Sequence, residues 1–490
     1  MLRLAKQLER FRAAVSGAIL TLALASCSTA NLDQFGFGER KESDAVADAL
    51  PPAQRKEHER LVSTYGGIYR APGLQALVEQ TINRLGTASE KPELKYRVTI
   101  LNSPAINAFA LPSGSLYVTR GLISLANDTA ELASVLSHEM AHVVARHAAI
   151  REDQIRAAVL NSRAISDTLS DPRLGALALQ RSRLSIATFS RGQELEADAV
   201  GVGIASRAGY DPFGASRFLN SMKRFAELRS ATLGAGQQRD IEVLSSHPST
   251  PERISIAVAN AKQFVNPKAT ERDREAFLRA LDGVTYGDDP KEGFVRGRVF
   301  LHPNLGISFT APDGFALENT PQAVLGATPS GREALRLDAV RVPDSQTLPD
   351  YISKGWVEGI DPLTVETFQI NGFEAASATA RGEQWSFRLF AVRYGSDVYR
   401  IAFAARDLSP QMEAGFSEAA ASFRRVSPEE AQAIRPLKIR LHQVVAGDTP
   451  ERLAQRSAFG DRNLERFLVL NGMQRGARLT PGDFVKVVTE

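Results

Sequence analysis

The stretch DTAELASVLSHEMAHVV, residues 128–144, carries both the clearest helix pattern of this chain and a pair of closely spaced histidines. Asp128 and Glu131 stand three residues apart, as the N-cap and capping-box residues of a helix start do. The apolar residues that follow recur at helical spacing, at Leu132, Leu136, Met140, Val143 and Val144. The stretch therefore predicts a helix on which residues 138 and 142 share one face.

Two histidines one helical turn apart, His138 and His142, can hold a metal ion, and Glu139 lies about 100° round the helix from the first of them. In zinc hydrolases with this spacing both imidazoles bind the metal, and the glutamate activates a metal-bound water. The chain has 7 histidines among 490 residues. Chance would produce the spacing in about one such chain per hundred or more, so a helix with unrelated histidines is the weaker interpretation.

A zinc site needs a third protein ligand, and the type of ligand separates the classes of zinc enzyme. One class has a glycine three residues, and a third histidine six residues, after the second histidine, where this chain has Ala145 and Ala148. His147 is one residue off, and on a continuous helix it would point about 140° away from His142. A third histidine ligand of that class is therefore not expected.

A carboxylate from a second helix is the other type of third ligand. In QELEAD, residues 193–198, Glu194 and Asp198 lie four residues apart on one helix face, and Glu196 lies on the opposite face. We assign Glu194 as the ligand and Asp198 as the carboxylate that orients a ligand imidazole. The expected cofactor is one zinc ion per chain.

Small residues on both helices favour their pairing. Ala145 and Ala149 lie seven and eleven residues after His138, and Gly201 and Ala205 lie at the same distances after residue 194. Such stripes let two helices approach closely enough for short side chains to share one ion. An ordinary alanine-rich composition is the alternative explanation.

Three motifs in order carry a family resemblance: HEMAH at 138–142, the segment 194–198, and NAFALP at 107–112 followed by YVTRG at 117–121. Over about residues 55–262 the chain resembles family forty-eight of the zinc metallopeptidases, in its HtpX-type and periplasmic BepA-like group. The resemblance implies a gluzincin-like catalytic domain that is mainly α-helical with a small β-sheet. It also implies peptidase activity on polypeptide substrates.

The same resemblance implies a substrate-binding edge strand at Asn107, Ala108, Phe109 and Ala110, joined to the next strand by a turn at 112–114. An edge strand has unpaired backbone groups, so an extended peptide can add to it as a further strand. A plain hairpin without a binding role is the alternative.

The N-terminus has the pattern of a bacterial lipoprotein signal peptide over residues 1–27. A basic leader precedes the apolar residues 13–25, and the segment 24–27, Leu-Ala-Ser-Cys, resembles a lipobox. Cys27 is the only cysteine, so we expect it to be lipidated and exclude intramolecular disulfides. Ser28, in place of an aspartate, favours the periplasmic face of the outer membrane of a Gram-negative bacterium. No later stretch is long and apolar enough to span a bilayer.

Composition and turn signals divide the rest of the chain. We expect a tether at 28–55, the zinc metallopeptidase domain at 56–265, a linker at 266–290, an α+β domain at 291–428 and a small βααβ module at 437–490. The α+β domain consists of strand-like runs between Gly, Pro and Asp turns, and it weakly resembles Mog/PsbP-like domains. It has no catalytic constellation, so we expect a binding or spacer role without a defined partner.

The last segment resembles a LysM module, in VVAGDT at 444–449, LNG at 470–472 and LTPGD at 479–483. Thr449 as N-cap and Pro450 at the first helical position suit the start of its first helix. The resemblance implies that the module binds peptidoglycan, and a structural module without a glycan groove is the alternative. The net charge of +3, with both signs scattered, gives no reason to expect a nucleic acid partner.

His247, in SSHPSTP at 245–251, is expected in a loop because prolines and hydroxyl residues surround it. The loop could bring His247 to the open side of the zinc. There the imidazole would either stabilise the oxyanion or occupy the water position as a reversible fourth ligand. An exposed loop imidazole is the alternative.

Taken together, the residues predict a zinc endopeptidase anchored to the outer membrane, which hydrolyses extended or misfolded envelope proteins with Glu139 as the general base. Its expected partners are polypeptide substrates, peptidoglycan through the C-terminal module, and the membrane through the lipid on Cys27. A peptidoglycan-directed hydrolase and a non-proteolytic chaperone or assembly factor are the alternatives.

Overall fold

The computed structural model describes residues 45–48, 50–169, 191–233, 247, 250–264 and 272–490, apart from 355, 358 and 383. The expected signal peptide with Cys27 and most of the expected tether lie outside the described residues. The described part falls into two compact units: a larger unit, residues 43–296 with 428–490, and a smaller unit, residues 297–427. Within the described residues, none of the helices combines the length and the apolar character that crossing a membrane requires.

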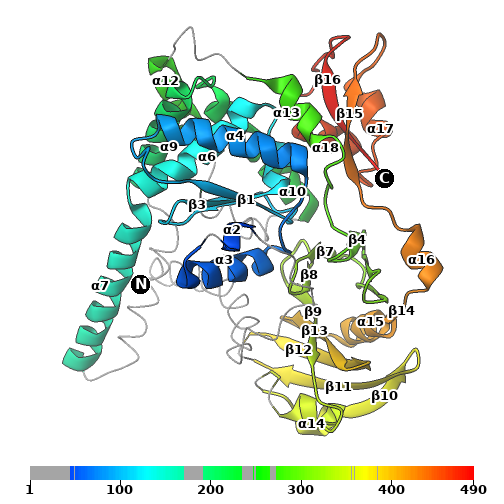
Figure 1. Cartoon of the computed structure of the whole chain (residues 1–490). Helices are drawn as coiled ribbons and strands as arrows, with labels where there is room; N and C mark the ends of the chain where they lie inside the picture. The colour runs from blue at the N-terminus through cyan, green and yellow to red at the C-terminus, as the bar shows by residue number, and fades with distance from the viewer. Residues whose placement is uncertain are drawn as a thin grey trace, which may run out of the picture. The chain divides into compact units, whose positions relative to one another are not determined.

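The larger unit is mainly helical, and its first part contains a small three-stranded sheet (Figure 1). The strands of this sheet are β1 (Arg97–Leu101), β2 (Ala108–Ala110) and β3 (Ser115–Thr119). Its described helices before residue 296 are α2 (Ala45–Asp48), α3 (Pro52–Thr64), α4 (Pro72–Ala88), α5 (Arg120–Leu125), α6 (Thr129–Val144), α7 (His147–Leu169), α9 (Arg191–Arg207), α10 (Gly214–Leu233), α12 (Pro251–Gln263) and α13 (Arg274–Leu281). This agrees with the expected fold class of a helical catalytic region with a small sheet.

Two of these helices lie where the sequence indicated irregular structure. Helix α3 begins at Pro52, inside the expected tether. Helix α13 lies inside the expected linker, and its Phe277 is fully buried in the core of the larger unit. An eight-residue helix offers too few turns for its apolar spacing to stand out in the sequence, so α13 was not anticipated.

Helix α6 has the start that the sequence predicts. The side chain of Asp128 accepts a hydrogen bond from the backbone N of Glu131 at 2.8 Å, and the carboxylate of Glu131 accepts one from the backbone N of Asn127 at 3.0 Å. The helix ends at Val144, and Arg146 follows with φ +58°, in the left-handed region. Because the chain turns here before α7, the expected continuation of the small-residue stripe to Ala149 is wrong.

The small sheet has the order β1-β3-β2, with β1 parallel and β2 antiparallel to β3. Strand β2 is therefore an edge strand, as the sequence predicts for this segment. The backbone N of Leu111 donates to Ser115 O at 2.8 Å across the turn, where Gly114 adopts φ +87°. The backbone N of Thr119 donates to Asn107 O at 2.9 Å. Since bonding alternates along an antiparallel pair, the backbone groups of Ala108 and Ala110 point away from β3, toward the open edge.

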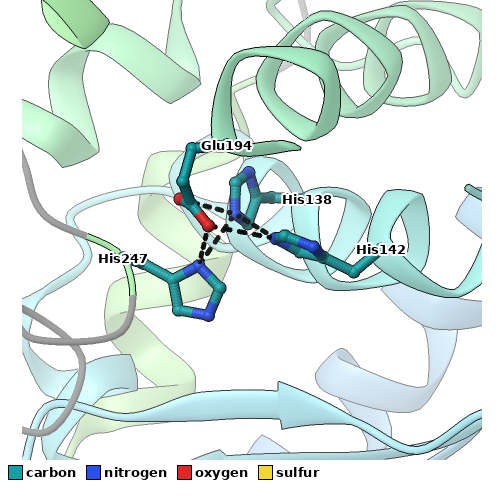
Figure 2. A group of neighbouring side chains, drawn as sticks. All are labelled: His138, His142, Glu194 and His247. Atoms are coloured by element: carbon teal, nitrogen blue, oxygen red, sulfur yellow. Dashed lines mark hydrogen bonds and ion pairs between the residues drawn. The ribbon is translucent and has the colours of Figure 1, made fainter. Parts of the chain in front are cut away.

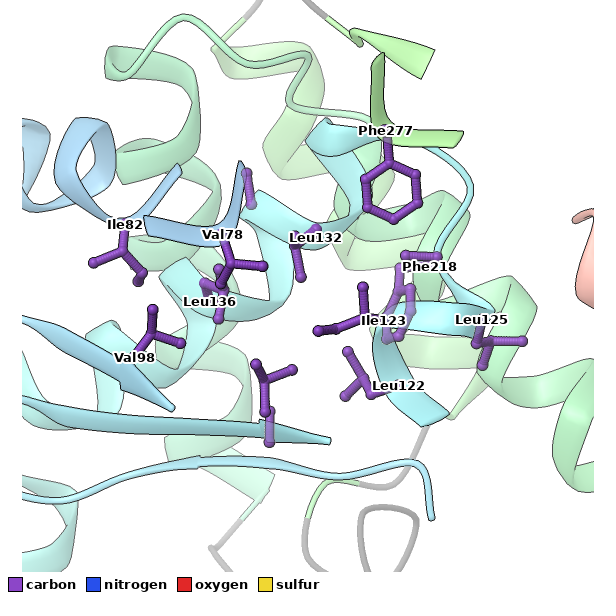
Figure 3. Close-up of a cluster of buried hydrophobic side chains, with 14 of the residues drawn as sticks. Val78, Ile82, Val98, Leu122, Ile123, Leu125, Leu132, Leu136, Phe218 and Phe277 are labelled. Carbon is purple, nitrogen blue, oxygen red and sulfur yellow. The ribbon is translucent and has the colours of Figure 1, made fainter. Parts of the chain in front are cut away.

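The core of the larger unit packs one face of α6 against α4, α10 and the sheet (Figure 3). Leu132 and Leu136 of α6 are fully buried there among Val78 of α4, Val98 of β1 and Phe218 of α10. Each such aliphatic side chain contributes about 1.5–3 kcal/mol when it is buried. This packing fixes α6 so that its other face, with the two histidines, is turned toward α9.

Helix α9 crosses α6 closely at Gly201. A Cβ atom at this position would lie 3.0 Å from the backbone N of His138, tighter than ordinary packing allows. The small residue that the sequence singled out at 201 is therefore needed for the approach of the two helices.

The C-terminal segment folds in the order strand, helix, helix, strand: β15 (Lys438–Gln443), α17 (Pro450–Gln455), α18 (Asn463–Leu470) and β16 (Phe484–Thr489). The two strands pair antiparallel. This βααβ module, which follows α16 (Pro428–Ala433), is part of the larger unit, and its Ile439 and Val469 belong to the same buried cluster as α6. Backbone hydrogen bonds join Ile439 to residues 283 and 284 at 2.8 Å each. The module is thus packed onto the helical region.

The smaller unit is β-rich. It contains β5 (Val299–His302), β6 (Ile307–Thr310), β7 (Ala316–Asn319), β8 (Val324–Ala327), β9 (Glu333–Arg341), β10 (Glu366–Ile370), β11 (Phe373–Arg381), β12 (Ser386–Tyr394), β13 (Asp397–Ala405) and β14 (Arg424–Arg425), with the helices α14 (Leu348–Ser353), η4 (Pro362–Thr364) and α15 (Pro410–Ala421). The short strand β4 (Phe294–Arg296) precedes it. Its main sheet is antiparallel in the order β10-β11-β12-β13-β9-β8-β7.

Candidate metal centre

Four buried side chains offer metal-binding atoms within 4.8 Å of one another (Figure 2). His138 and His142 come from α6, Glu194 comes from the first turn of α9, and His247 comes from the stretch before α12. Sequence reasoning singled out all four residues, and the structure brings all four together.

The spacing of these atoms fits a tetrahedral zinc ion. Zinc bonds of about 2.0–2.1 Å to nitrogen or oxygen place neighbouring ligand atoms about 3.3–3.4 Å apart. The Nε2 atoms of His138 and His142 are 3.1 Å apart, and they lie 3.6 Å and 3.5 Å, respectively, from the carboxylate oxygens of Glu194. The Nδ1 atom of His247 lies 3.3 Å from Nε2 of His138 and 2.8 Å from Oε1 of Glu194. The residues therefore fit the ion that the sequence predicts.

Asp198 lies behind His138, as the sequence reasoning expected of it. Its Oδ1 is 3.0 Å from Nδ1 of His138, the ring nitrogen opposite the one that faces the other donors. Burial alone would raise the pKa of Asp198, but hydrogen bonds from Arg253 and His138 lower it to about 2. The carboxylate is therefore charged at neutral pH and can hold the imidazole in one orientation.

Arg253 is a buried residue of the centre that sequence reasoning missed. Its guanidinium donates to both oxygens of Asp198, at 2.8 Å and 2.7 Å, and its Nη1 lies 2.8 Å from Oε2 of Glu194. Thr250 caps the start of α12 and thereby fixes the helix turn on which Arg253 lies. From sequence alone, an arginine near the start of a helix is expected at the surface. The available signal was the pair of carboxylates one turn apart, which require a cation when they are buried.

His147 also lies in the centre, and our prediction that it points away from His142 is wrong. Its Nδ1 is 2.8 Å from Nδ1 of His142, and its Nε2 is 3.4 Å from Oε2 of Glu196. The prediction assumed one continuous helix, whereas the chain turns at Arg146. Glu196 itself lies away from the donor atoms, with a side chain that is 58% exposed.

Glu139 lies beside the donors without being one of them. Its Oε1 is 3.9 Å from Nε2 of His247. Burial raises the pKa of Glu139 to about 8, with the Glu194 carboxylate adding to the effect and His138 and Arg253 opposing it. Burial, together with the neighbouring histidines, strongly lowers the pKa of His142, which keeps its imidazole neutral and able to bind a metal.

The predicted substrate-binding segment lies on β2. Asn107 is buried, and its side-chain amide donates to the hydroxyl of Tyr65 at 2.8 Å. The ring of Phe109 stacks on Tyr117 with centroids 4.9 Å apart. Tyr65 and Tyr117 thus hold these two side chains, and the backbone groups of Ala108 and Ala110 point away from β3.

The chain is similar to known metallopeptidases in this region. A family model described as Peptidase family M48 matches residues 70–260. The beta-barrel assembly-enhancing protease of Yersinia pestis is 30% identical over 234 residues, which are 44% of this chain and 45% of that protein. The protein of the same description in Escherichia coli strain K12 is 29% identical over 215 residues, 41% of this chain and 42% of that protein.

The chain is also similar to mitochondrial metalloendopeptidases. The metalloendopeptidase OMA1 of Schizosaccharomyces pombe is 33% identical over 186 residues, 36% of this chain and 50% of that protein. The chain thus spans about half the length of the curated relatives it matches. Among solved structures, a solution structure of PsbP from Synechocystis covers 28% of this chain at 14% identity, with a TM-score of 0.22 that is too low to show a common fold.

The matched region contains α4, the small sheet, α6, α9 and most of α12, and all four donor residues lie within its bounds. Its histidine and glutamate donors have the composition of a gluzincin-type site. Residues 70–260 of this chain therefore match Peptidase family M48, and His138, His142, Glu194 and His247 within them form a candidate metal site of the gluzincin type.

Proposed function

We propose that this protein is a zinc endopeptidase of the bacterial envelope that hydrolyses extended or misfolded envelope proteins. The observation that supports it best is the donor set of His138, His142 and Glu194 at zinc-ligand spacing, with the buried carboxyl of Glu139 beside it. Similarity to the beta-barrel assembly-enhancing proteases supports the envelope as the site of action.

In this proposal His138, His142 and Glu194 hold the zinc ion, and Asp198 and Arg253 hold those ligands in place. When it is bound, zinc lowers the pKa of a coordinated water to about 7 and polarises the scissile carbonyl. Glu139 takes the proton of the attacking water and passes it to the leaving amine.

Substrate capture would use the open edge of β2. The backbone groups of Ala108 and Ala110 point away from β3, so an extended chain can pair with them as an added strand. Main-chain pairing is largely independent of sequence, which suits an enzyme whose substrates share an unfolded state more than a motif.

His247 would act as a reversible fourth ligand. Its Nδ1, 3.3 Å from Nε2 of His138 and 2.8 Å from Oε1 of Glu194, would take the ligand position that a catalytic zinc site leaves to water. The enzyme would be latent while His247 holds this position. The position favours this role over that of an oxyanion-stabilising cation.

Two further segments would place the enzyme in the envelope. Lipidation of Cys27 would attach it to the periplasmic face of the outer membrane, and the C-terminal βααβ module would bind peptidoglycan as LysM modules do. The strand and helix order of residues 438–489 supports the second assignment. Both attachments would raise the local concentration of enzyme at its substrates.

The proposal is tested by metal analysis combined with casein cleavage, for the wild type and for Glu139→Gln. We expect both proteins to bind one zinc ion per chain, and the variant to lose cleavage by several orders of magnitude because a carboxamide cannot accept the proton. Zinc binding with full cleavage by the variant would contradict the mechanism. Absence of zinc from the wild type would contradict the site itself.

A peptidoglycan-directed hydrolase is the second candidate, and the βααβ module is the observation that favours it. Incubation with purified peptidoglycan separates the two functions. Release of soluble muropeptides by the wild type, but not by Glu139→Gln, would replace the proteolytic function with this one. A non-proteolytic chaperone would suppress aggregation equally well with either protein.

A further inference from the structure

We propose that His147 is a positioning residue for the zinc ligand His142, and that it acts as the middle member of a chain of contacts from His142 to Glu196 at the surface. This inference rests on the zinc site of the proposed function. It concerns a histidine that none of the catalytic steps uses and that is only 1% exposed.

The two nitrogens of His142 face different groups. Its Nε2 points to the other donors, 3.1 Å from Nε2 of His138. Its Nδ1 lies 2.8 Å from Nδ1 of His147, with the two ring planes 69° apart. Such a distance and inclination are those of a hydrogen bond between two imidazoles.

Metal binding sets the direction of that hydrogen bond. When Nε2 of His142 gives its lone pair to zinc, the proton of the neutral ring is on Nδ1, so His142 is the donor. Nδ1 of His147 must then be the acceptor, and the proton of its neutral ring is on Nε2. That nitrogen faces Oε2 of Glu196 at 3.4 Å, a carboxylate oxygen that can only accept. Each member of the chain therefore has the one protonation pattern that suits its neighbours.

The two histidine ligands of α6 are thus supported in different ways. Behind His138 lies a charged carboxylate, Asp198, which is itself held by Arg253. Behind His142 lies a neutral imidazole, which reaches a carboxylate only through a second contact. Partners of this kind orient the ligand ring and commonly change metal affinity by 10–100-fold when they are removed.

The backbone between the two histidines is shaped for this contact. On a continuous helix a residue five positions after His142 would lie about 140° round the axis. The chain instead leaves the helix at Arg146, whose φ of +58° is a left-handed conformation that costs a residue other than glycine about 1–2 kcal/mol. The turn returns His147 to the side of His142. Glycine would adopt this conformation more readily, so the turn itself does not require arginine.

The test compares zinc dissociation constants of the full chain, measured by competition with a chromogenic chelator, for His147→Ala and His147→Asn. Alanine removes the acceptor, so we expect a 10–100-fold weaker zinc affinity. Asparagine places its Oδ1 near the position of the imidazole Nδ1, so we expect its affinity to lie within about threefold of the wild type. In the cobalt-substituted proteins, the visible spectrum should change for the alanine variant and be retained for the asparagine variant.

His58→Ala provides the matched control. His58 is another fully buried histidine of the larger unit, and its Nδ1 lies 2.8 Å from the hydroxyl of Tyr117, on a different helix from the donor set. We expect this variant to lower the melting temperature of the zinc-free protein while leaving the zinc dissociation constant within about threefold of the wild type.

Two results would overturn the role of His147. One is a zinc affinity of His147→Ala equal to that of the wild type. The other is equal loss of affinity in His147→Ala, His147→Asn and His58→Ala, which would mark a general effect on stability. In either case a wild type that binds zinc and requires Glu139 would leave the proposed function intact, so the two failures are distinguishable.

Discussion

Three carboxyl groups, those of Glu139, Glu194 and Asp198, lie buried at the metal centre, where Arg253 contacts two of them. Fully ionised, they would leave two negative charges after this guanidinium is counted. Buried charge of that size is costly, and a dication would balance it. Burial raises the pKa of Glu139 for the same reason, and the Glu194 carboxylate adds to the effect. The charges therefore favour a bound dication independently of the distances.

Replacing His247 by alanine tests latency at the scale of one residue. In the proposed function Nδ1 of His247 is a reversible fourth ligand, so we expect His247→Ala to cleave casein several-fold faster and to digest itself faster. His442→Ala is the control, because this partly exposed imidazole belongs to the βααβ module, and its rate of casein cleavage should match that of the wild type. Slower cleavage by His247→Ala would instead support a role in oxyanion stabilisation.

Glu131, in the first turn of α6, should make stability depend on pH. Burial raises its pKa to about 7, Asp128 adds to this, and Arg217 and Lys486 oppose it. Between about pH 4.5 and 7 the folded protein then binds more protons than the unfolded chain, so this group lowers stability as the pH rises.

The prediction is that the stability of the wild type relative to Glu131→Gln falls across this range by at least about 1.4 kcal/mol, the equivalent of one pKa unit. Urea unfolding of the zinc-free proteins from pH 4 to pH 8 measures the difference. A difference that does not change with pH, or that grows in favour of the wild type as the pH rises, would contradict the assignment.

At the scale of single elements, the sequence predicted what local spacing determines. Helix α6 and the close approach at Gly201 follow from periodicity and from a small side chain, whereas the edge position of β2 was implied by the family resemblance. The direction of His147 could not be predicted, because one left-handed residue changes the course of the chain without a glycine to signal it. Arg253 could not be predicted either, because its partners lie 55 and 59 positions away in the sequence.

Strand β16 provides a test of how the βααβ module supports α6. Lys486 is fully buried, and its Nζ donates to the backbone oxygens of Ser124 and Ala126 at 2.7 Å each, just before the cap of α6. We expect Lys486→Met to lower the free energy of unfolding by about 2–4 kcal/mol, because two buried carbonyls lose their donor.

The same substitution should increase amide hydrogen exchange in the first turns of α6, at residues 129–135, more than elsewhere in the larger unit. Lys438→Met is the control, since Lys438 is only half-buried on the neighbouring strand, and it should cost less than about 0.5 kcal/mol. Equal exchange of α6 in Lys486→Met and in the wild type would show that the module does not support the helix start.

For the whole molecule, the placement in the envelope depends on residues outside the described part of the chain. We predict that Cys27→Ala abolishes membrane attachment and leaves either a periplasmic form or an uncleaved precursor, because a single side chain would carry the lipid. Cell fractionation followed by mass determination measures this. A cleaved Cys27→Ala protein that stays with the outer membrane would point to a different anchor.

The packing of the βααβ module against the helical region fixes the orientation of the module relative to the metal centre. Ile439 and Lys486 attach this module to the core against which α6 packs, so the module and the candidate metal centre on α6 keep one relative orientation. If the module binds the cell wall, its orientation on the wall would fix the direction in which the metal centre faces, and substrates would reach it from one side only. A spin label on α7 would test this orientation. The label should lose its rotational motion when the protein binds isolated sacculi, whereas a flexible attachment between the module and the helical region would leave the label rotating freely.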